Sequence, residues 1–341
     1  MNVILHSNYK ILNENGNMLK GVGDVSVKDF LKQMGHLKSV GQQSGINFYT
    51  SDEIDITEVS CVIFIDCPEP HSDFYTKVVN NNIEAKLMVW ESGIINPRNI
   101  DTSYHEYFTT VFTYDDDLVD NSKYVKLCYA FDFPVGLPSV PFETKKLCCL
   151  ISGNKFSEHP LELYSKRLEF IHWFENNQPT SFDLYGQGWN KIVPPRNVFH
   201  RIINRFPALT VLRGVGYSTY KGEVDCKLDI YRGYKFSLCY ENAVGLTGYV
   251  SEKIFDCLFS GCVPIYLGAD NISEHIPREC FIDMREFDSI SELFEYMESM
   301  SDLEYSIYQK SISDFLEKGR NGIFSLDYFS STIIGELNNE V

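Results

Sequence analysis

The stretch between residues 234 and 253 places charged side chains where a strand-like run gives way to a helix-like run. YKFSLCYEN (234–242) predicts a strand, a glycine-containing loop follows, and YVSEK (249–253) opens a helix predicted over about 251–260. Backbone N–H groups and the dipole at a helix start favour an anion, and Lys253 adds a full positive charge in the first turn. Glu252 can accept hydrogen bonds from a ribose diol. A nucleoside diphosphate site is therefore one interpretation of this pattern.

The same three residues also fit an ordinary helix start. Ser251 is a good N-cap, Glu252 interacts favourably with the helix dipole, and Lys253 is then a solvated cation. Taken alone, residues 251–253 favour this second interpretation, so the choice depends on the wider pattern.

Carboxylates follow two predicted strands in the first third of the chain. Glu91 follows AKLMVW (85–90), and Asp115-Asp116-Asp117 follows TTVFTY (109–114). In open α/β sheets the ligand crevice lies beyond the carboxyl ends of strands, so Glu91 falls where chemistry is expected. Three carboxylates can hold a hard cation. Because the triplet is far in sequence from Lys253, we favour a solvated turn or an acceptor contact and predict no metal site.

Strand-like and helix-like patterns alternate along the whole chain, which predicts parallel sheets covered by helices. The expected strands are 2–6, 59–66, 85–90, 109–114, 146–152, 182–186, 234–242 and 263–268. The expected helices are about 27–34, 161–176, 251–260 with Gly261 closing it, and one with an apolar stripe at Ile290, Leu293, Phe294 and Met297.

Prolines mark the boundary between two predicted lobes. The stretch 131–146 contains three of the 13 prolines, which interrupt helix and strand alike. We expect an α/β protein with two Rossmann-like, doubly wound lobes and an intervening cleft. The predicted divisions are an N-terminal lobe (1–134), a linker (135–145), a C-terminal lobe (146–320) and a C-terminal tail or helix (321–341).

Composition excludes several classes of protein. The 341 residues carry a formal charge of −17, which disfavours a general nucleic-acid binder. No apolar stretch approaches the roughly 20 residues that cross a bilayer, and the start, MNVILHSNYK, resembles no signal peptide. The ten cysteines include no CxxC pair and the eight histidines no HExxH, so we expect buried, reduced thiols in a cytosolic protein.

Several blocks resemble the donor-binding domain of glycosyltransferase family 10, the α-1,3/1,4-fucosyltransferases. The order and spacing match over about 45 residues through YKFSLCYEN, GYVSEK (248–253) and VPIYLG (263–268). Further similar blocks are LISGN (150–154), YSKR (164–167) and YKGEVDCKLDIYRGYKF (220–236). VWESG (89–93) resembles the place of the family's ESP motif, with Gly93 replacing the proline. The resemblance is firm over about 146–290, thinner over 85–134 and absent from the first 60 residues.

The resemblance implies a GT-B fold with an N-terminal acceptor lobe and a C-terminal lobe that binds GDP-fucose. Glu91 looks like the general base. The donor-binding residues implied by the matching motifs are Glu252 for the ribose, Lys253 and Arg167 for the diphosphate, Asn242 and Tyr249 for the nucleotide sugar, and Asn154 for the same pocket.

The implied activity is inverting transfer of fucose from GDP-fucose to a hydroxyl of a glycan acceptor. No cofactor is expected, although a divalent cation can stimulate such enzymes. The chain resembles bacterial or viral members that act in the cytoplasm on lipopolysaccharide or capsule precursors, so a lipid-linked oligosaccharide is one candidate acceptor. Two alternatives remain, namely another GDP-deoxyhexose donor and a nucleotide-sugar binding protein without turnover.

A basic segment stands out in this acidic chain. No Asp or Glu occurs from Leu184 to Gly222. This segment contains Lys191, Arg196, Arg201, Arg205, Arg213 and Lys221, interleaved with Trp189, Val198, Phe199, Ile202, Ile203 and Phe206. It suits either peripheral contact with an anionic membrane through 189–213, or a basic rim around the GDP site, or a solvated helix.

Overall fold

The computed structural model describes residues 1–21, 28–195, 198–205 and 216–338, and the chain divides into two compact units. The first unit comprises Met1–Phe133, Leu246–Val250 and Lys318–Val341, and the second comprises Pro134–Gly245 and Ser251–Glu317. The loop 246–250 and the C-terminal segment therefore belong to the first unit, although the chain between them, Ser251–Glu317, belongs to the second.

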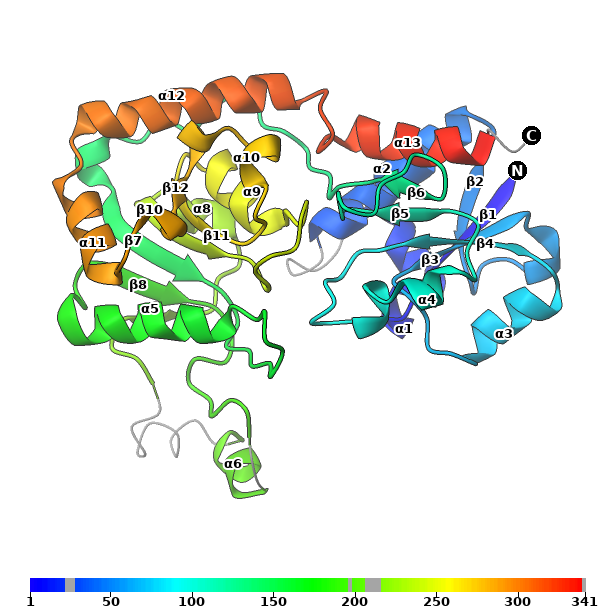
Figure 1. The fold of residues 1–341 in the computed structure, drawn as a ribbon, viewed down its shortest axis with the longest axis horizontal. Helices are drawn as coiled ribbons and strands as arrows, with labels where there is room; N and C mark the ends of the chain where they lie inside the picture. Colours follow the sequence, from blue (N-terminus) through cyan, green and yellow to red (C-terminus); the bar gives the residue numbers. More distant parts are fainter. Residues whose placement is uncertain (22–27, 196–197, 206–215, 339–341) are drawn as a thin grey trace. The chain divides into compact units, whose positions relative to one another are not determined.

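The first unit is built on a parallel sheet in the order β2-β1-β3-β4-β5-β6 (Figure 1). The strands are β1 (Asn2–Ser7), β2 (Asn47–Thr50), β3 (Cys61–Ile65), β4 (Glu84–Met88), β5 (Val111–Thr113) and β6 (Tyr124–Lys126). The chain passes from β1 outward to β2 and then returns to β3 on the other side. The topological switch point, where open α/β sheets bind ligands, lies between β1 and β3.

One face of this sheet is covered by α2 (Lys28–Gln43) and α13 (Leu326–Asn338), which contact each other (Figure 1). Side chains alternate between the faces of a strand, so Val3 and Leu5 of β1 point to this side. They join one apolar core with Leu31 and Leu37 of α2 and Ile333 of α13. The C-terminal helix is therefore part of the first unit's core.

The opposite face carries aromatic side chains. Phe64 of β3 makes edge contacts with Phe74 and Tyr75 of α3 (Asp73–Asn80) and with Phe108, which follows α4 (Thr102–His105). The remaining short elements of the unit are α1 (Lys10–Asn13), η1 (Glu14–Leu19), η3 (Ile56–Glu58) and η4 (Pro97–Asn99).

The second unit has a parallel sheet in the order β12-β11-β10-β7-β8-β9. The strands are β7 (Lys146–Ile151), β8 (Phe182–Tyr185), β9 (Tyr220–Gly222), β10 (Tyr234–Tyr240), β11 (Val263–Leu267) and β12 (Ile282–Asp283). Its switch point lies between β7 and β10, because β8 and β9 add on one side and the later strands on the other.

Helices flank this sheet as well (Figure 1). Phe170 and Phe174 of α5 (Tyr164–Asn177) pack against Phe182 of β8. α9 (Glu252–Phe259) contacts β10, β11 and α8 (Lys227–Tyr231). The other helices are α6 (Val198–Ile203), α10 (Ile272–His275), α11 (Ile290–Ser299), α12 (Asp302–Gly319), η5 (Phe142–Thr144), η6 (Arg278–Cys280) and η7 (Met284–Glu286).

The two parallel sheets agree with the predicted α/β class. Gly261 has a φ of +64° directly after α9, as expected for a residue that closes a helix. The sequence patterns missed β2, β6, β9 and β12, which are two to four residues long and too short for a period-two signal. The helix predicted over about 27–34 is also too short. α2 runs to Gln43, because its second half packs on α13 and β2.

The cysteines follow the predicted pattern in most cases. All ten, each of which lies within the described residues, are thiols, and all except the exposed Cys226 are buried. None of the helices in the described ranges is long and apolar enough to cross a membrane.

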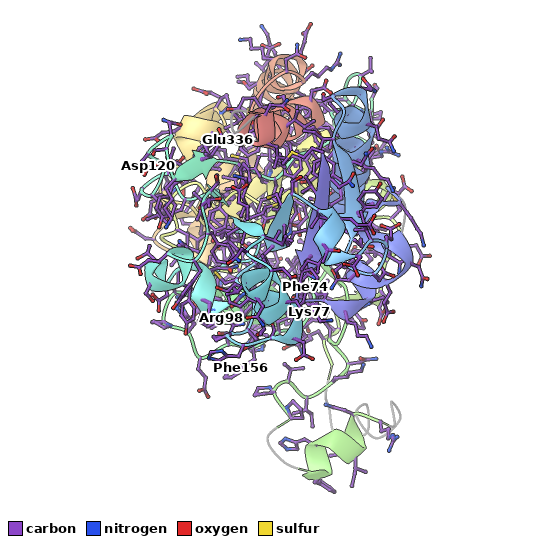
Figure 2. All side chains as sticks on the ribbon, turned by 90° about the vertical axis from the view of Figure 1, so that its right-hand side faces the viewer. Phe74, Lys77, Arg98, Asp120, Phe156 and Glu336 are labelled. Atoms are coloured by element: carbon purple, nitrogen blue, oxygen red, sulfur yellow. The ribbon has the colours of Figure 1, made fainter. Side chains whose placement is uncertain are left out.

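Phe174 tests the core of the second unit. Its side chain is fully buried, with ring centroids 4.9 Å from both Phe170 and Phe182. Phe174→Ala leaves a cavity and is expected to lower the free energy of unfolding by about 3–5 kcal/mol in urea denaturation. Phe156→Ala is the matched control, since Phe156 is 49% exposed (Figure 2) and its change is expected to stay within about 0.5 kcal/mol. Equal losses in both variants would contradict the assigned core.

Candidate functional site

Arg167 of α5 lies against the carboxyl end of β10, at the switch point of the second unit. Its Nη2 donates to the carbonyl oxygens of Tyr240 and Glu241, each at 2.7 Å, and to Oδ1 of Asn242 at 3.2 Å. Arg167 is 4% exposed. The structure therefore brings the predicted residues Arg167 and Asn242 into direct contact and concentrates positive charge at the end of the strand.

Glu241 is a fully buried carboxylate that joins the end of β10 to the start of α9. Its Oε1 accepts from the backbone N–H of Ser251 at 2.9 Å, and its Oε2 accepts from the Ser251 hydroxyl at 2.6 Å. Lys253 Nζ donates to the same Oε2 at 3.1 Å and to Ser251 Oγ at 2.9 Å. Lys253 is thus held in place by a carboxylate, and the expectation of a solvated cation at this helix start is wrong.

Charge at this site is balanced among several groups. Burial lowers the pKa of Lys253, and the positive charge of Arg167 lowers it further. Glu241 and Glu252 outweigh these two effects, so the pKa of Lys253 is raised. Burial also disfavours the charged form of Glu252, yet Lys253 and Lys227 lower its pKa to about 2. Both residues are therefore ionised at neutral pH, as binding of a diphosphate and a ribose requires.

Lys227 of α8 is a charged residue of this cluster that the sequence patterns did not single out. Its Nζ lies 2.9 Å from Asp256 Oδ2, and its positive charge reaches Glu252. Burial opposes its charge, but Asp256 and Glu252 raise its pKa. Nothing in the local run CKLDIY distinguishes this lysine, because its partners come from α9.

Asn154 and Tyr249 lie in different surroundings from the Lys253 cluster. Asn154 follows β7, and its Nδ2 donates to the carbonyl oxygen of Gly188 at 3.1 Å. Tyr249 belongs to the first unit, where its buried ring lies 5.0 Å from that of Tyr114. The roles assigned to both residues stay predictions.

Glycine is required directly before Tyr249. Gly248 has a φ of +71°, and a Cβ there would lie 2.1 Å from the carbonyl oxygen of Tyr114. The loop 246–250 therefore packs tightly on the segment that follows β5.

Glu91 follows the carboxyl end of β4, as predicted. Its backbone N–H and that of Trp90 both donate to Asp66 Oδ1 at 2.8 Å, and its carbonyl oxygen accepts from Asn99 Nδ2 at 2.8 Å. Glu91 is partly exposed, whereas Asp66 and Asn99 are buried. Hydrogen bonds to its backbone therefore fix the loop that carries Glu91.

Asp66 is a second residue that the sequence patterns did not single out, although it ends the run VSCVIFID. Its Oδ1 also accepts from Asn99 Nδ2 at 2.6 Å, and its backbone φ is +66°. Burial raises its pKa, in opposition to these three hydrogen bonds. Burial, followed by the charges of Glu91 and Asp66, also raises the pKa of Tyr9, so Tyr9 lies close to this acidic pair.

The three consecutive aspartates have protein partners. The Thr247 hydroxyl donates to Asp115 Oδ1 and to Asp117 Oδ2, each at 3.0 Å, and Asp116 pairs with Lys126. Among the residues with described positions, no group of three or more His, Cys, Asp or Glu side chains is arranged to hold a metal ion. The roles favoured for the triplet, a solvated turn or an acceptor contact, stay predictions.

The basic segment is described only in part. Arg196, Phe206 and Arg213 lie outside the described residues, as do the side chains of Val198 and Arg201. Phe199 and Ile202 on α6 are 51% and 48% exposed, whereas Ile203 and Trp189 are buried. Contact of 189–213 with a membrane stays a prediction.

Comparison with solved structures defines the class of fold. An α1,3-fucosyltransferase crystallised with GDP-fucose aligns with a TM-score of 0.52 and 15% identity, over 99% of this chain and 91% of that chain. Anabaena Alr3699/HepE in complex with UDP aligns with a TM-score of 0.57 and 8% identity, over 99% and 100%. The predicted GT-B fold of glycosyltransferases is confirmed.

Sequence comparison then identifies the family. Residues 144–311 match the family model for "Glycosyltransferase family 10 (fucosyltransferase) C-term". The alpha-(1,3)-fucosyltransferase FucT of Helicobacter pylori is 33% identical over 112 residues, which are 32% of this chain and 22% of that protein. Residues 144–311 therefore form a glycosyltransferase family 10 domain, and the chain spans about a fifth of the length of this curated relative.

The pKa of Glu252 predicts how it contributes to stability. Because this pKa is about 2 in the fold and ordinarily 4.5, the carboxylate stabilises the fold above about pH 4.5, and the contribution is lost as the pH falls toward 2. The difference in free energy of unfolding between wild type and Glu252→Gln is therefore expected to shrink below pH 4.5 in urea titrations. Glu158→Gln, at an exposed position, serves as control. A pH-independent difference for Glu252→Gln would contradict the ion cluster.

Proposed function

We propose that this family 10 chain is an inverting glycosyltransferase that moves fucose from GDP-fucose to a hydroxyl of a glycan acceptor. The observation that carries the proposal is the charge cluster of Arg167, Glu252 and Lys253 at the carboxyl end of β10. All three residues lie within the segment that matches the family model. A nucleoside diphosphate sugar suits this cluster, because cations meet the diphosphate and a carboxylate meets the ribose.

The proposed chemistry follows from charge. The acceptor oxygen forms a bond to the anomeric carbon while the bond from that carbon to the phosphate oxygen breaks, and GDP leaves with the electron pair. Lys253 and Arg167 stabilise the growing negative charge on GDP, which is larger in the transition state than in the ground state. Glu91 accepts the proton of the acceptor hydroxyl. Attack opposite to the leaving group inverts the anomeric centre.

The remaining donor residues have supporting roles in the proposal. Asn242 is held by Arg167 and Asn154 by Gly188, so both amides are preorganised for contact with the nucleotide sugar. Tyr249 is the least supported donor contact, since its ring is buried beside Tyr114. Turnover needs no cofactor, and a divalent cation is at most a stimulant.

Two other functions are retained for specific reasons. Another GDP-deoxyhexose fits the same cluster, because the proposed contacts of the cluster are to the diphosphate and the ribose and not to the sugar hydroxyls. A binding protein without turnover differs only in the role of Glu91. Action in the cytoplasm on a glycan or lipid-linked oligosaccharide, with peripheral membrane contact through 189–213, belongs to the proposal and is carried by the family resemblance.

Glu91 decides between enzyme and binding protein. Glu91→Gln removes the base and keeps the size of the side chain, so transfer from GDP-fucose is expected to fall by about 10²–10⁴-fold while GDP affinity is retained. Fucosyl transfer to a glycan panel and calorimetry with GDP measure the two properties. Glu106→Gln, at an exposed position of the same unit, is the matched control. Turnover equal to wild type would remove Glu91 from the mechanism.

Lys253 tests the diphosphate site. Loss of its charge in Lys253→Met is expected to weaken GDP binding by about 10–100-fold, the usual effect of losing a hydrogen bond to a charged group. Lys253→Arg keeps the charge beside Glu241 and is expected to retain part of the affinity, which separates phosphate binding from folding. Lys155→Met, on the exposed loop after β7, is the control. Unchanged GDP affinity by calorimetry in a folded Lys253→Met protein would contradict the assignment.

A further inference from the structure

A cavity of about 170 Å³ lies in the first unit, beyond the carboxyl end of β3. Residues 67–71 form one wall, and the other wall consists of the aromatic side chains Tyr75, Tyr104, Tyr107 and Phe108. These come from α3 and from the segment around α4, which cover the same face of the sheet (Figure 1). A water molecule needs about 10–15 Å³ of such volume, so the cavity has room for a monosaccharide ring.

The cavity lies at the switch point of the first sheet. The residues that follow β1 and β3 meet here, since Asn8 Nδ2 donates to the carbonyl oxygen of Cys67 at 3.0 Å. The loop between β3 and α3 is held in an unusual backbone shape, with φ values of +66° at Asp66 and +64° at His71. Open α/β sheets bind ligands at this position because no crossover helix covers it.

Hydrogen bonds connect the wall of the cavity to the loop of Glu91. The backbone N–H of Cys67 donates to Asn99 Oδ1 at 2.8 Å, and Asn99 Nδ2 donates to the carbonyl oxygen of Glu91 at 2.8 Å. Asp66, the neighbour of Cys67, accepts from the backbone N–H of Glu91 at 2.8 Å. A ligand in the cavity therefore lies against the same rigid loop system that carries the proposed base.

The lining suits a neutral sugar. The rings of Tyr75 and Tyr107 lie 6.4 Å apart at an angle of 80°, and Tyr107 is 68% exposed, so aromatic faces are available to a ligand. The C–H faces of a pyranose pack on such rings, while its hydroxyls need a few polar partners. Glu69 supplies a carboxylate whose Oε1 lies 2.9 Å from Arg98 Nη2. No lysine or arginine is among the described residues that line the cavity, which disfavours an anionic ligand.

We propose that this aromatic cavity is a subsite for one neutral pyranose ring of the acceptor glycan. The proposal rests on the proposed function for its relevance to transfer, whereas binding of a free sugar can be measured without turnover. Occupation of the subsite holds the acceptor by one ring and presents a hydroxyl of the same glycan to Glu91. Tyr75, Tyr104 and Tyr107 then determine which acceptor sugars bind.

Saturation-transfer NMR on the full chain tests the subsite. The probes are the methyl β-glycosides of galactose, glucose and N-acetylglucosamine, methyl α-mannoside, and octyl β-glucoside. At least one methyl glycoside is expected to receive saturation on its ring protons from wild type. Tyr107→Ala and Tyr104→Ala are expected to weaken its binding by about tenfold or more, since each removes one aromatic face. Tyr107→Phe, which keeps the ring, is expected to retain binding.

Tyr328→Ala is the matched control, because Tyr328 is a partly exposed tyrosine on α13 of the same unit. Absence of ring saturation for every methyl glycoside overturns the subsite, as does equal binding by wild type and both alanine variants. Saturation confined to the octyl protons of octyl glucoside would show an acyl-chain site and also overturn it. GDP affinity is measured on the same samples. Failure of GDP binding with retained sugar binding would contradict the proposed function and leave the subsite intact.

Discussion

The buried carboxylate of Glu241 is the constraint on which the candidate donor site depends. Taking a carboxylate out of water costs several kcal/mol unless charge and hydrogen bonds compensate it. Here a backbone N–H and a hydroxyl from Ser251, together with the ammonium of Lys253, provide that compensation. The same contacts fix where α9 begins relative to the end of β10, so the fold of the unit also positions Lys253, the proposed phosphate ligand.

The surroundings of Glu241 are adapted to this arrangement. A Cβ on Gly268 would lie 2.6 Å from Glu241 Cγ and 2.5 Å from the Tyr266 hydroxyl, so the loop after β11 needs a glycine there. On the other side, Arg167 donates to the carbonyl oxygens of Tyr240 and Glu241 at the end of β10. Lys253 is thereby less free to move than a surface lysine, so the proposed binding of a phosphate would cost little of its conformational entropy.

Asp66 is a buried carboxylate of the first unit with a position similar to that of Glu241. Both carboxylates stand at a topological switch point, both are buried, and both accept hydrogen bonds from the backbone of a loop that carries a proposed functional residue. The difference lies in charge compensation. Glu241 has an ammonium beside it, whereas Asp66 Oδ1 accepts its three hydrogen bonds from neutral donors, and burial raises the Asp66 pKa.

The sequence by itself determined the features that depend on neighbours along the chain. Strand-to-helix alternation predicted the α/β class, a strand end predicted Glu91 and a helix start predicted Glu252 as candidates, and the blocks around 234–268 predicted the family. Only the tertiary structure decided which charges meet. Lys227 reaches Glu252 from another helix, Asp66 accepts a hydrogen bond from a loop 25 residues away, and Tyr249 packs beside Tyr114 in the first unit. Such pairings depend on burial and on contacts between distant segments, and no local pattern encodes them.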